Sequence, residues 1–277
     1  MDKIEKIGAS VVQHGKLNDR IYLMNMSEND AFTLPKKLVN LAKENEYTKI
    51  FAKVPSTAVE PFQRHGFFKE AHIPNFYHGK TGMYCVSKFL DPERAEIPLK
   101  DRLEVRKIIQ LTKAKKPIPA ELEHEKIAIR EISENDVNAL THLFKSTFKT
   151  YPFPIFDVGY IKETMADNVR YFGAFEGNNL VAASSAEIDF TEKNAGMTDF
   201  AVDPKFRSNG LALLLLLKME EEMKKINIKV LYTIARALSP AMNITFAKAR
   251  YYFGGTLKNN TNIAGKIESM NVWYKSI

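Results

Sequence analysis

A short loop in the second half of the chain has the residue types of an anion-binding site. A predicted strand at 197–202 ends in Asp203 and Pro204, which favour a turn, and an apolar helix is predicted from residue 211 to about 226. Backbone N–H groups at a helix start have no partners within the helix, and together with the helix dipole they attract anions. Between strand and helix lie Arg207, Ser208, Asn209, Gly210, Leu211 and Ala212.

The residue types in this loop suit a phosphate group. Gly210 lets the backbone approach a ligand without a side chain in the way, and Ala212 is small enough for close contact at the helix start. Arg207 adds a fixed positive charge. An ordinary strand–turn–helix corner is the alternative interpretation, and the setting of the loop between a strand and a long apolar helix favours the anion site.

The pattern Arg-x-x-Gly-x-Ala resembles the acetyl-coenzyme A signature of the GNAT superfamily, Arg/Gln-x-x-Gly-x-Gly/Ala. The resemblance implies that residues 207–212 cradle the pyrophosphate of acetyl-CoA, which is the expected cosubstrate. It also implies that the backbone of the preceding strand, at Phe200, Ala201 and Val202, pairs with the pantetheine arm. The sequence therefore predicts an N-acetyltransferase domain.

Longer strings are similar to the β-lysine N-acetyltransferases of methanogenic archaea. The resemblance covers the second half of the chain, and its longest part is NITFAKARYYFGGTLKNNTNIAGKIESMNVWYK. The other strings are YPFPIF, MTDFAV and YTIARA, with KIFAKVP and KEAHIPNFYHGK in the first half. This resemblance implies acetylation of the side-chain amine of β-lysine to N6-acetyl-β-lysine, a compatible solute. The alternatives are another small amine, a polyamine or a protein lysine as acceptor, and a non-catalytic acyl-CoA-binding module.

The position of the general base departs from the GNAT pattern. An acceptor amine must lose its proton before it attacks a thioester, and a carboxylate normally takes that proton. GNAT enzymes carry a Glu early in the fourth strand, where this chain has Gly196. Asp199 and Glu187 are the nearest carboxylates in sequence, although strict alternation would put Asp199 on the opposite face unless the strand has a bulge. If the missing base limits the rate, Gly196→Glu should raise turnover.

The position of the usual acid for the leaving thiolate also differs. The resemblance places Phe246 where GNAT enzymes have a tyrosine, and a phenylalanine can only pack against the cofactor. Tyr251 is the candidate replacement, with Tyr252 and Tyr232 as alternatives, although each also suits core packing. Asn243, at the start of the same predicted helix, is expected either to hydrogen-bond the pantetheine amides or to cap the helix.

Five residues are candidates for binding the acceptor. Arg236 suits a bidentate contact with a substrate carboxylate, and Glu268 suits a second ammonium group. Asn271 lies on the same predicted strand as Glu268. Tyr151 and Phe153 follow the first predicted helix of this domain in a loop broken by prolines, and they are expected either to wall the acceptor pocket or to pack in the core.

A mixed α/β domain is needed to bring these residues together. Residues 126–277 predict the order β-α-β-β-β-α-β-α-β-β, which is a GNAT fold with a central mixed sheet splayed into a V and flanked by helices. Ser133 with Asp136 predicts a capping box, and Gly177 predicts a hairpin turn. The predicted strands are 126–132, 171–175, 180–190, 197–202, 230–235, 255–263 and 267–274, with helices at 135–149, at 211–226 and from residue 240.

The first half of the chain repeats this pattern more weakly. A helix is predicted at 34–46 and a strand at 49–54, and the string FQRHGFF follows at 62–68. These features predict a smaller, degenerate GNAT-like α/β domain at 1–98. Because it lacks the Arg-x-x-Gly-x-Ala loop, this domain is expected to be structural or to shape the acceptor site. Residues 99–125, with Pro117 and Pro119, are predicted to form a linker with one helical stretch.

Composition narrows the class of protein. The chain has 277 residues and a net charge of +7, but its basic and acidic residues are interleaved, which argues against a nucleic-acid partner. Cys85 is the single cysteine, so the sequence predicts no disulfide, and the six scattered histidines predict no metal site. The chain has no apolar signal core and no membrane-length apolar run, so a cytoplasmic enzyme is expected. A homodimer is compatible with these features.

Overall fold

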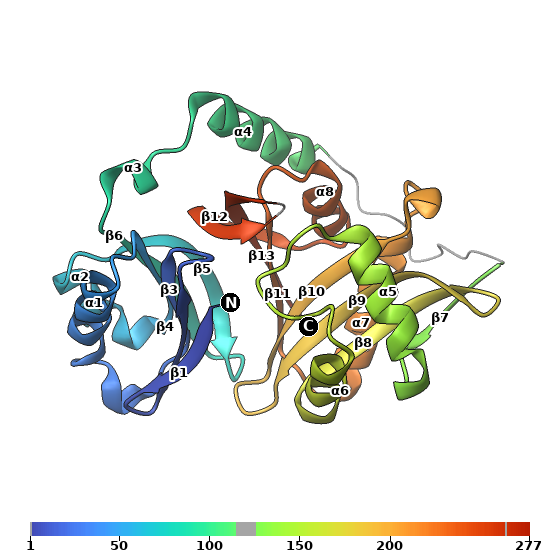
Figure 1. The fold of residues 1–277 in the computed structure, drawn as a ribbon, viewed down its shortest axis with the longest axis horizontal. Helices are drawn as coiled ribbons and strands as arrows, with labels where there is room; N and C mark the ends of the chain where they lie inside the picture. The colour runs from blue at the N-terminus through green and yellow to red at the C-terminus, as the bar shows by residue number, and fades with distance from the viewer. Residues whose placement is uncertain (1, 115–125, 264) are drawn as a thin grey trace.

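The strands of the chain form one mixed sheet that runs through both halves. The computed structural model describes residues 2–114, 126–263 and 265–277. Within these residues the sheet has 13 strands in the order β1-β2-β3-β4-β6-β5-β12-β13-β11-β10-β9-β8-β7. Helices lie beside the sheet in each half (Figure 1). The mixed α/β fold predicted from the sequence is therefore confirmed.

The C-terminal half has the predicted order of strands and helices. Ser133 and Asp136 form the predicted capping box, and Gly177 turns the chain between two strands with a φ of 57°. One helix was not predicted, because its start is marked only by Asp157, which caps it by accepting from the N–H of Tyr160. The strands are β7 (Ile127–Glu131), β8 (Val169–Glu176), β9 (Asn179–Asp189), β10 (Asn194–Val202), β11 (Val230–Arg236), β12 (Tyr252–Ile263) and β13 (Lys266–Ser276), and the helices are α5 (Val137–Thr147), the unpredicted α6 (Val158–Asp167), α7 (Leu211–Lys225) and α8 (Pro240–Lys248).

The N-terminal half repeats part of this topology. β3 runs parallel to β4 as β10 runs parallel to β11, and β4-β6-β5 are antiparallel neighbours as are β11-β13-β12. Helices α1 and α7 follow β3 and β10 in the chain. The sequence did not predict the first three strands. The elements are β1 (Lys3–Ile7), β2 (Ser10–Gly15), β3 (Arg20–Asn25), α1 (Leu34–Glu44), β4 (Lys49–Pro55), α2 (Val59–Arg64), β5 (Phe68–Tyr77), β6 (Thr81–Phe89), α3 (Pro92–Ala95) and α4 (Leu99–Lys113).

The predicted linker begins with a helix. α4 starts at Leu99 and contacts α8 of the C-terminal half. Pro117 and Pro119 belong to residues 115–125, which lie outside the described residues. The domain boundary at 99–125 therefore stays a prediction.

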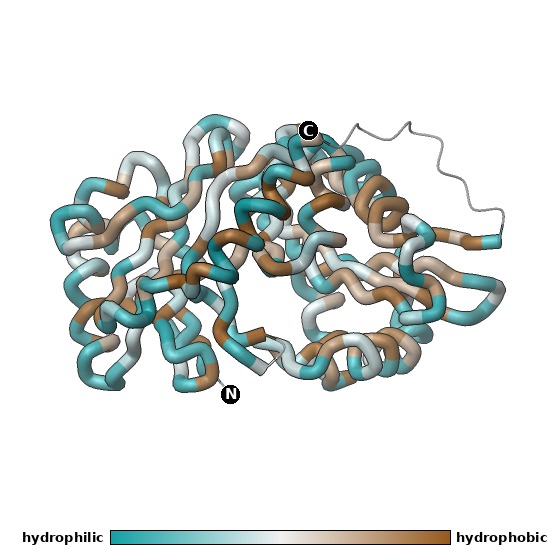
Figure 2. The backbone as a smooth tube through the Cα atoms, turned by 90° about the horizontal axis from the view of Figure 1, so that it is seen from above, coloured by the Kyte–Doolittle hydropathy of each residue, from teal (hydrophilic) through white to brown (hydrophobic). Residues whose placement is uncertain are grey.

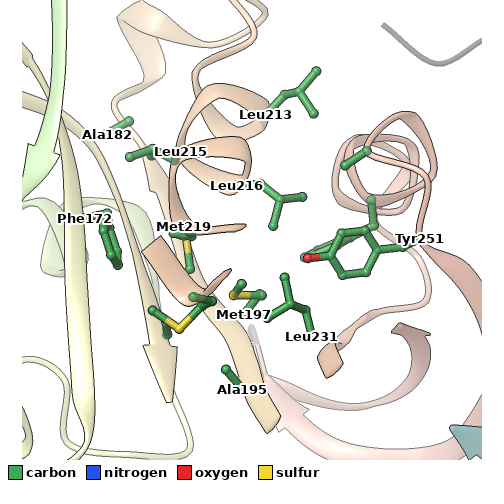
Figure 3. Packing of buried hydrophobic residues seen from close by; sticks show 14 of the residues in the cluster. Phe172, Ala182, Ala195, Met197, Leu213, Leu215, Leu216, Met219, Leu231 and Tyr251 are labelled. Carbon is green, nitrogen blue, oxygen red and sulfur yellow. The ribbon is translucent and has the colours of Figure 1, made fainter. Parts of the chain in front are cut away.

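The main core of the C-terminal half lies between α7 and the sheet. Leu215, Leu216 and Met219 on α7 are fully buried and belong to the same cluster as Phe172 and Leu231 from the strands (Figure 3). Short hydrophobic and hydrophilic stretches alternate along the backbone, as expected of elements with one buried face (Figure 2). This packing fixes the start of α7, where the predicted anion loop ends, against the end of β10.

The two halves join where β5 meets β12. Gly255 pairs with Ala71 across this seam and has a φ of 143°. A Cβ on Gly255 would lie 2.3 Å from the carbonyl oxygen of Glu70, and one on Gly254 would lie 2.8 Å from that of His72. Only glycine therefore permits so close an approach of the two backbones.

A buried ion pair reinforces the seam. The side chains of Lys49 and Glu70 are 0% and 2% exposed, and their charged atoms lie 3.0 Å apart. Lys49 also donates to the carbonyl of Lys258 at 2.6 Å, and the N–H of Lys258 donates to the other oxygen of Glu70 at 2.8 Å. Ser87 donates to Glu70 at 2.5 Å. Both charges are thus hydrogen-bonded across the junction of the two halves.

Glu70→Ala is expected to lower the free energy of unfolding by about 3–5 kcal/mol, because it leaves the Lys49 ammonium buried without a counter-charge. Chemical denaturation measures the change. Glu60→Ala is the matched control, since Glu60 pairs with Arg64 on α2 with both side chains 72% exposed, and it should cost less than about 1 kcal/mol. Equal losses in the two variants would contradict the role of the seam.

Candidate active site

The predicted anion loop connects β10 to α7 and is open to solvent. Asp203 accepts from the N–H of Lys205 at 2.8 Å and so starts the short turn Pro204–Phe206. Residues 207–210 are exposed, and Gly210, with a φ of 75°, is the residue before α7. A Cβ on Gly210 would meet nothing within 4 Å, so its left-handed backbone, and not contact with the protein, requires a glycine. The amides that open α7 thus border open space, as an anion site requires.

β10 and β11 separate before this loop. Their parallel pairing covers three positions, from Asn194 with Val230 to Gly196 with Tyr232, and then ends. Among the described residues no strand pairs with this edge of β10 from residue 197 onward. Phe200 and Phe246 pack edge to face beside the opening, with ring centroids 5.6 Å apart. This is the V that the sequence predicted, and within the described chain it leaves β10 without a strand partner on that side beyond Gly196.

A cavity of about 240 Å³ lies at this opening, and both halves of the chain line it. The C-terminal half contributes two carboxylates, Glu187 and Asp199. The N-terminal half contributes two cations, Arg20 and Lys53, which the sequence analysis did not single out. Other lining residues include Tyr22, Phe51, Tyr151, Phe153, Phe200, Tyr232, Arg236 and Phe246.

Glu187 occupies the position directly across the sheet from Gly196. The antiparallel register of β9 and β10 pairs these two residues. Directly opposite residues share a face of the sheet, with Cβ atoms about 4.5–5.5 Å apart. The face of the sheet at Gly196 therefore carries a carboxylate, supplied by the neighbouring strand.

A β-bulge turns Asp199 toward the same region. The register of β9 and β10 shifts between Thr198 and Ala201, and Asp199 has a φ of 55°. Asp199 is 9% exposed. One oxygen accepts from the hydroxyl of Tyr151, and the other accepts from Ser185 at 2.5 Å. Regular alternation would place Asp199 on the opposite face of the sheet. The bulge instead brings it to Tyr151 and Ser185.

Two hydroxyls link the carboxylates. Thr198 donates to Glu187 at 3.2 Å, and the hydroxyls of Thr198 and Ser185 lie 2.8 Å apart. Ser185 in turn donates to Asp199. Three contacts join Glu187 to Asp199, but the two hydroxyls supply only two protons. A proton on Glu187 would complete the chain, with each group donating to the next as far as Asp199.

Burial shapes the titration of this cluster. Glu187 is exposed to the open cavity but surrounded by protein elsewhere, and this desolvation, with the charge of Asp199, raises its pKa to about 7. Burial also raises the pKa of Asp199, against the hydrogen bonds from Ser185 and Tyr151, which lower it. Burial and Asp199 raise the pKa of Tyr151, so Tyr151 stays a neutral donor. Glu187 is therefore a carboxylate that changes its charge near neutral pH.

Three sequence-predicted site residues lie in the protein interior and do not line the cavity. Tyr251 is 4% exposed and packs against Phe246. It lies in the hydrophobic core beside Leu231 (Figure 3). Asn243 donates to the carbonyls of Arg236 and Ser239 and accepts from Asn271 and Trp273. Asn271 also accepts from Thr256. These contacts give Asn243 and Asn271 structural roles, and the burial of Tyr251 separates it from the chemistry proposed for it.

Arg236 and Glu268, expected to bind opposite ends of the acceptor, bind each other instead. Two nitrogens of Arg236 donate to the two oxygens of Glu268 at 2.9 and 2.8 Å. Arg236 borders the cavity, whereas Glu268 is 1% exposed. Because each charge is neutralised by the other, this pair lacks the free cation and free anion that the two separate roles require.

The site and the fold together define an acyl-transfer protein. An open helix start follows the inner strand of a splayed pair, and a carboxylate that titrates near neutral pH lies in the adjoining cavity. A profile of the acetyltransferase (GNAT) family matches residues 137–245. The chain belongs to this family, whose members use acetyl-CoA.

Relatives match the chain along nearly its whole length. It is 40% identical to a β-lysine N(6)-acetyltransferase of Methanococcus maripaludis over 275 residues, 99% of each chain. It is 30% identical to the N-acetyltransferase YodP of Bacillus subtilis, over 97% of this chain and 96% of YodP. The ribosomal-protein-S18-alanine N-acetyltransferase structure from Escherichia coli covers 55% of this chain and 94% of its own, with 16% identity and a TM-score of 0.48.

The described residues contain no group of three or more His, Cys, Asp or Glu side chains that could hold a metal ion. Across the same part of the chain, no helix combines the length and the apolar character needed to cross a membrane.

Proposed function

We propose that this protein transfers the acetyl group of acetyl-CoA to the side-chain amine of β-lysine, giving N6-acetyl-β-lysine. The observation that carries the catalytic part is Glu187, a carboxylate with a pKa of about 7 in the cavity beside the splayed strands. The relative from Methanococcus maripaludis supports the acceptor, because it matches both halves of the chain that line the cavity.

The chain's own residues suit the coenzyme. Residues 207–212 offer an exposed stretch at 207–210, the start of α7 and the Arg207 charge to a pyrophosphate. The open edge of β10 at Phe200, Ala201 and Val202 can hydrogen-bond the pantetheine amides, as a strand would. Phe246 packs beside this edge through Phe200 and is positioned to contact the arm. When bound, acetyl-CoA supplies the activated acetyl group.

Glu187 acts as the general base. The acceptor nitrogen forms the amide bond while the carbon–sulfur bond breaks, and Glu187 accepts the proton that the nitrogen loses. That proton completes the hydroxyl chain through Thr198 and Ser185 to Asp199, so Asp199 favours its uptake. Asp199 is thus a positioning residue for Glu187, and Tyr151 holds Asp199 in place. Phe246 cannot donate a proton to the sulfur, and we assign that proton to solvent.

Release of free thiol tests the proposal directly. Purified protein is incubated with acetyl-CoA alone and with β-lysine, and the product is identified by mass spectrometry. Thiol release that requires β-lysine, with the acetyl group on N6, is the expected result. Release with a polyamine or a protein lysine but not with β-lysine would reject the acceptor, and tight binding of acetyl-CoA without turnover on any amine would reject the catalytic role.

Gly196→Glu is expected to leave turnover unchanged or lower it by up to about tenfold. A Cβ at Gly196 would meet the Tyr232 ring at 3.5 Å, an ordinary contact, so the fold should tolerate the change. The new carboxylate would face Glu187 across the strands and raise its pKa further, because two nearby carboxylates resist ionising together. Steady-state kinetics at pH 7 measures the effect. A clear gain in kcat would show that Glu187 does not already serve as the base.

A further inference from the structure

Arg20 on β3 is a buried cation without a carboxylate partner among the described residues. Arg20 is 5% exposed and lines the cavity. One guanidinium nitrogen, Nη1, donates to the carbonyl of Asn260 and to the hydroxyl of Thr261, the latter at 3.0 Å. The Nε atom is buried and has no hydrogen-bond partner. A guanidinium is rarely buried without a counter-charge, because desolvation of the charge is costly.

The surroundings of Arg20 keep its charge but leave it unneutralised. The ring centroids of Tyr22 and Phe51, which stack on each other, lie 5.3 and 5.9 Å from the guanidinium carbon, so two aromatic rings lie beside the cation. Burial lowers the pKa of Arg20 to about 10, which still leaves it protonated at neutral pH. The wall of the cavity therefore carries the charged guanidinium of Arg20, held in place by its contacts.

Lys53 on β4 adds a second such cation. Its ammonium lies 3.4 Å from the hydroxyl of Tyr232 and 5.6 Å from the ring centroid of Tyr22, and no ion pair within the described chain neutralises it. The other buried or cavity-lining cations of this region differ, since Lys49 pairs with Glu70 and Arg236 with Glu268. Positive charge from the N-terminal half thus faces Glu187 and Asp199 from the C-terminal half.

We propose that Arg20, assisted by Lys53, binds the carboxylate of the acceptor while the acceptor's distal amine reaches Glu187. This inference rests on the proposed function and assigns the N-terminal half as the part that selects amino acids over plain diamines. The ligand group is a carboxylate because a guanidinium that lines the cavity without a counter-charge favours an anion whose oxygens can accept its N–H groups. Arg20 contributes binding and orientation, and it takes no part in proton transfer.

The test compares β-lysine with its carboxamide, which has the same amines but no negative charge. The wild type should prefer β-lysine by at least about tenfold in kcat/KM, since a hydrogen-bonded charge pair of this kind is worth about that much or more. Arg20→Gln should remove this preference by raising the KM for β-lysine at least about tenfold, with little change for the carboxamide. Lys53→Met should also reduce the preference for β-lysine. It leaves the contacts of Arg20 with Asn260 and Thr261 intact.

Arg94→Gln is the matched control. Arg94 also donates from the N-terminal half to β12, at the carbonyl of Asn259 at 2.8 Å, but it pairs with Asp19 and does not line the cavity. It should leave the preference for β-lysine unchanged. Equal losses on both acceptors in Arg20→Gln and Arg94→Gln would overturn the proposal and indicate a purely structural arginine.

Calorimetric binding of the same two acceptors separates this inference from the proposed function. If the wild type does not turn over β-lysine, the proposed function fails. Weaker binding of the carboxamide to the wild type, with the difference lost in Arg20→Gln, would still support the carboxylate site. Equal binding of both acceptors to the wild type would overturn it.

Discussion

Glu187→Gln is expected to lower kcat by about 10²- to 10⁴-fold, the range that a positioned general base contributes. The amide is nearly isosteric with the carboxylate and can still accept from Thr198, so the fold and the cavity should remain. It cannot take the proton that the acceptor amine must lose. The KM for acetyl-CoA should change little, because the coenzyme loop follows the far end of β10, whereas Glu187 lies opposite Gly196 near the start of that strand. Steady-state kinetics with β-lysine measures both constants.

The pH profile gives a second readout of the same change. A base must be deprotonated to act, and the pKa of Glu187 is raised to about 7 by burial and by Asp199. Wild-type activity should therefore rise with pH through about 7, and this step should vanish in Glu187→Gln. Asp199→Asn removes the charge that raises this pKa, and it should shift the step toward lower pH.

The control replaces an exposed carboxylate. Glu221 on α7 pairs with lysines at the surface, and Glu221→Gln makes the same change of charge away from the cavity. It should leave kcat and the pH profile unchanged. A Glu187→Gln protein that is folded and retains most of its activity would eliminate Glu187 as the base.

Gly210→Glu is expected to weaken acetyl-CoA binding by about tenfold or more. The new carboxylate would project from the start of α7 into the space where the pyrophosphate is proposed to lie. Two like charges about 4 Å apart repel by about 1 kcal/mol in water and about 4 kcal/mol near a protein surface. Because this loop is exposed, the repulsion energy is expected to be nearer the lower of these two values. Equilibrium binding of CoA measures the loss.

Gly177→Glu separates the charge effect from backbone strain. Gly177 has a φ of 57°, against 75° at Gly210, and neither position has a neighbour within 4 Å of an added Cβ. Both variants therefore place a glutamate in the left-handed region, at a similar cost of about 1–2 kcal/mol. Gly177 lies in the hairpin between β8 and β9, so its variant should bind CoA normally. Similar affinities for the two variants would reject the loop assignment.

The local parts of the fold followed from the sequence. The capping box at Ser133, the hairpin at Gly177 and the start of α7 after Gly210 each depend on a few adjacent residues whose types favour one backbone conformation. The sequence of strands and helices along the C-terminal half followed from the same rhythm of turns and apolar runs, although the helix α6 was missed. The first three strands of the N-terminal half could not be predicted, because polar and apolar residues do not alternate regularly along them.

The arrangement of the site depended on long-range pairing that a single sequence does not specify. Glu187 and Asp199 were candidates by proximity in the chain, but the contacts of Asp199 with Ser185 and Tyr151 depend on the bulge between Thr198 and Ala201, which breaks the alternation expected of a strand. Arg236 and Glu268 were expected to bind a ligand separately. They are 32 positions apart in the sequence, and nothing in the sequence indicated that they pair with each other. Arg20 was missed because it precedes Thr261 by 241 positions and comes from the half expected to be inactive.

The seam at Gly255 gives this chain a particular route for evolutionary change. A repeated strand–helix unit that lacks the coenzyme loop has been retained, edge to edge, as one wall of its neighbour's cavity. On the proposed function, we expect substitutions at Arg20 on that wall to alter which amine is accepted while the loop before α7 stays intact. Exchanging the N-terminal units of related enzymes, with the two glycines kept, would thus transfer acceptor preference as a module.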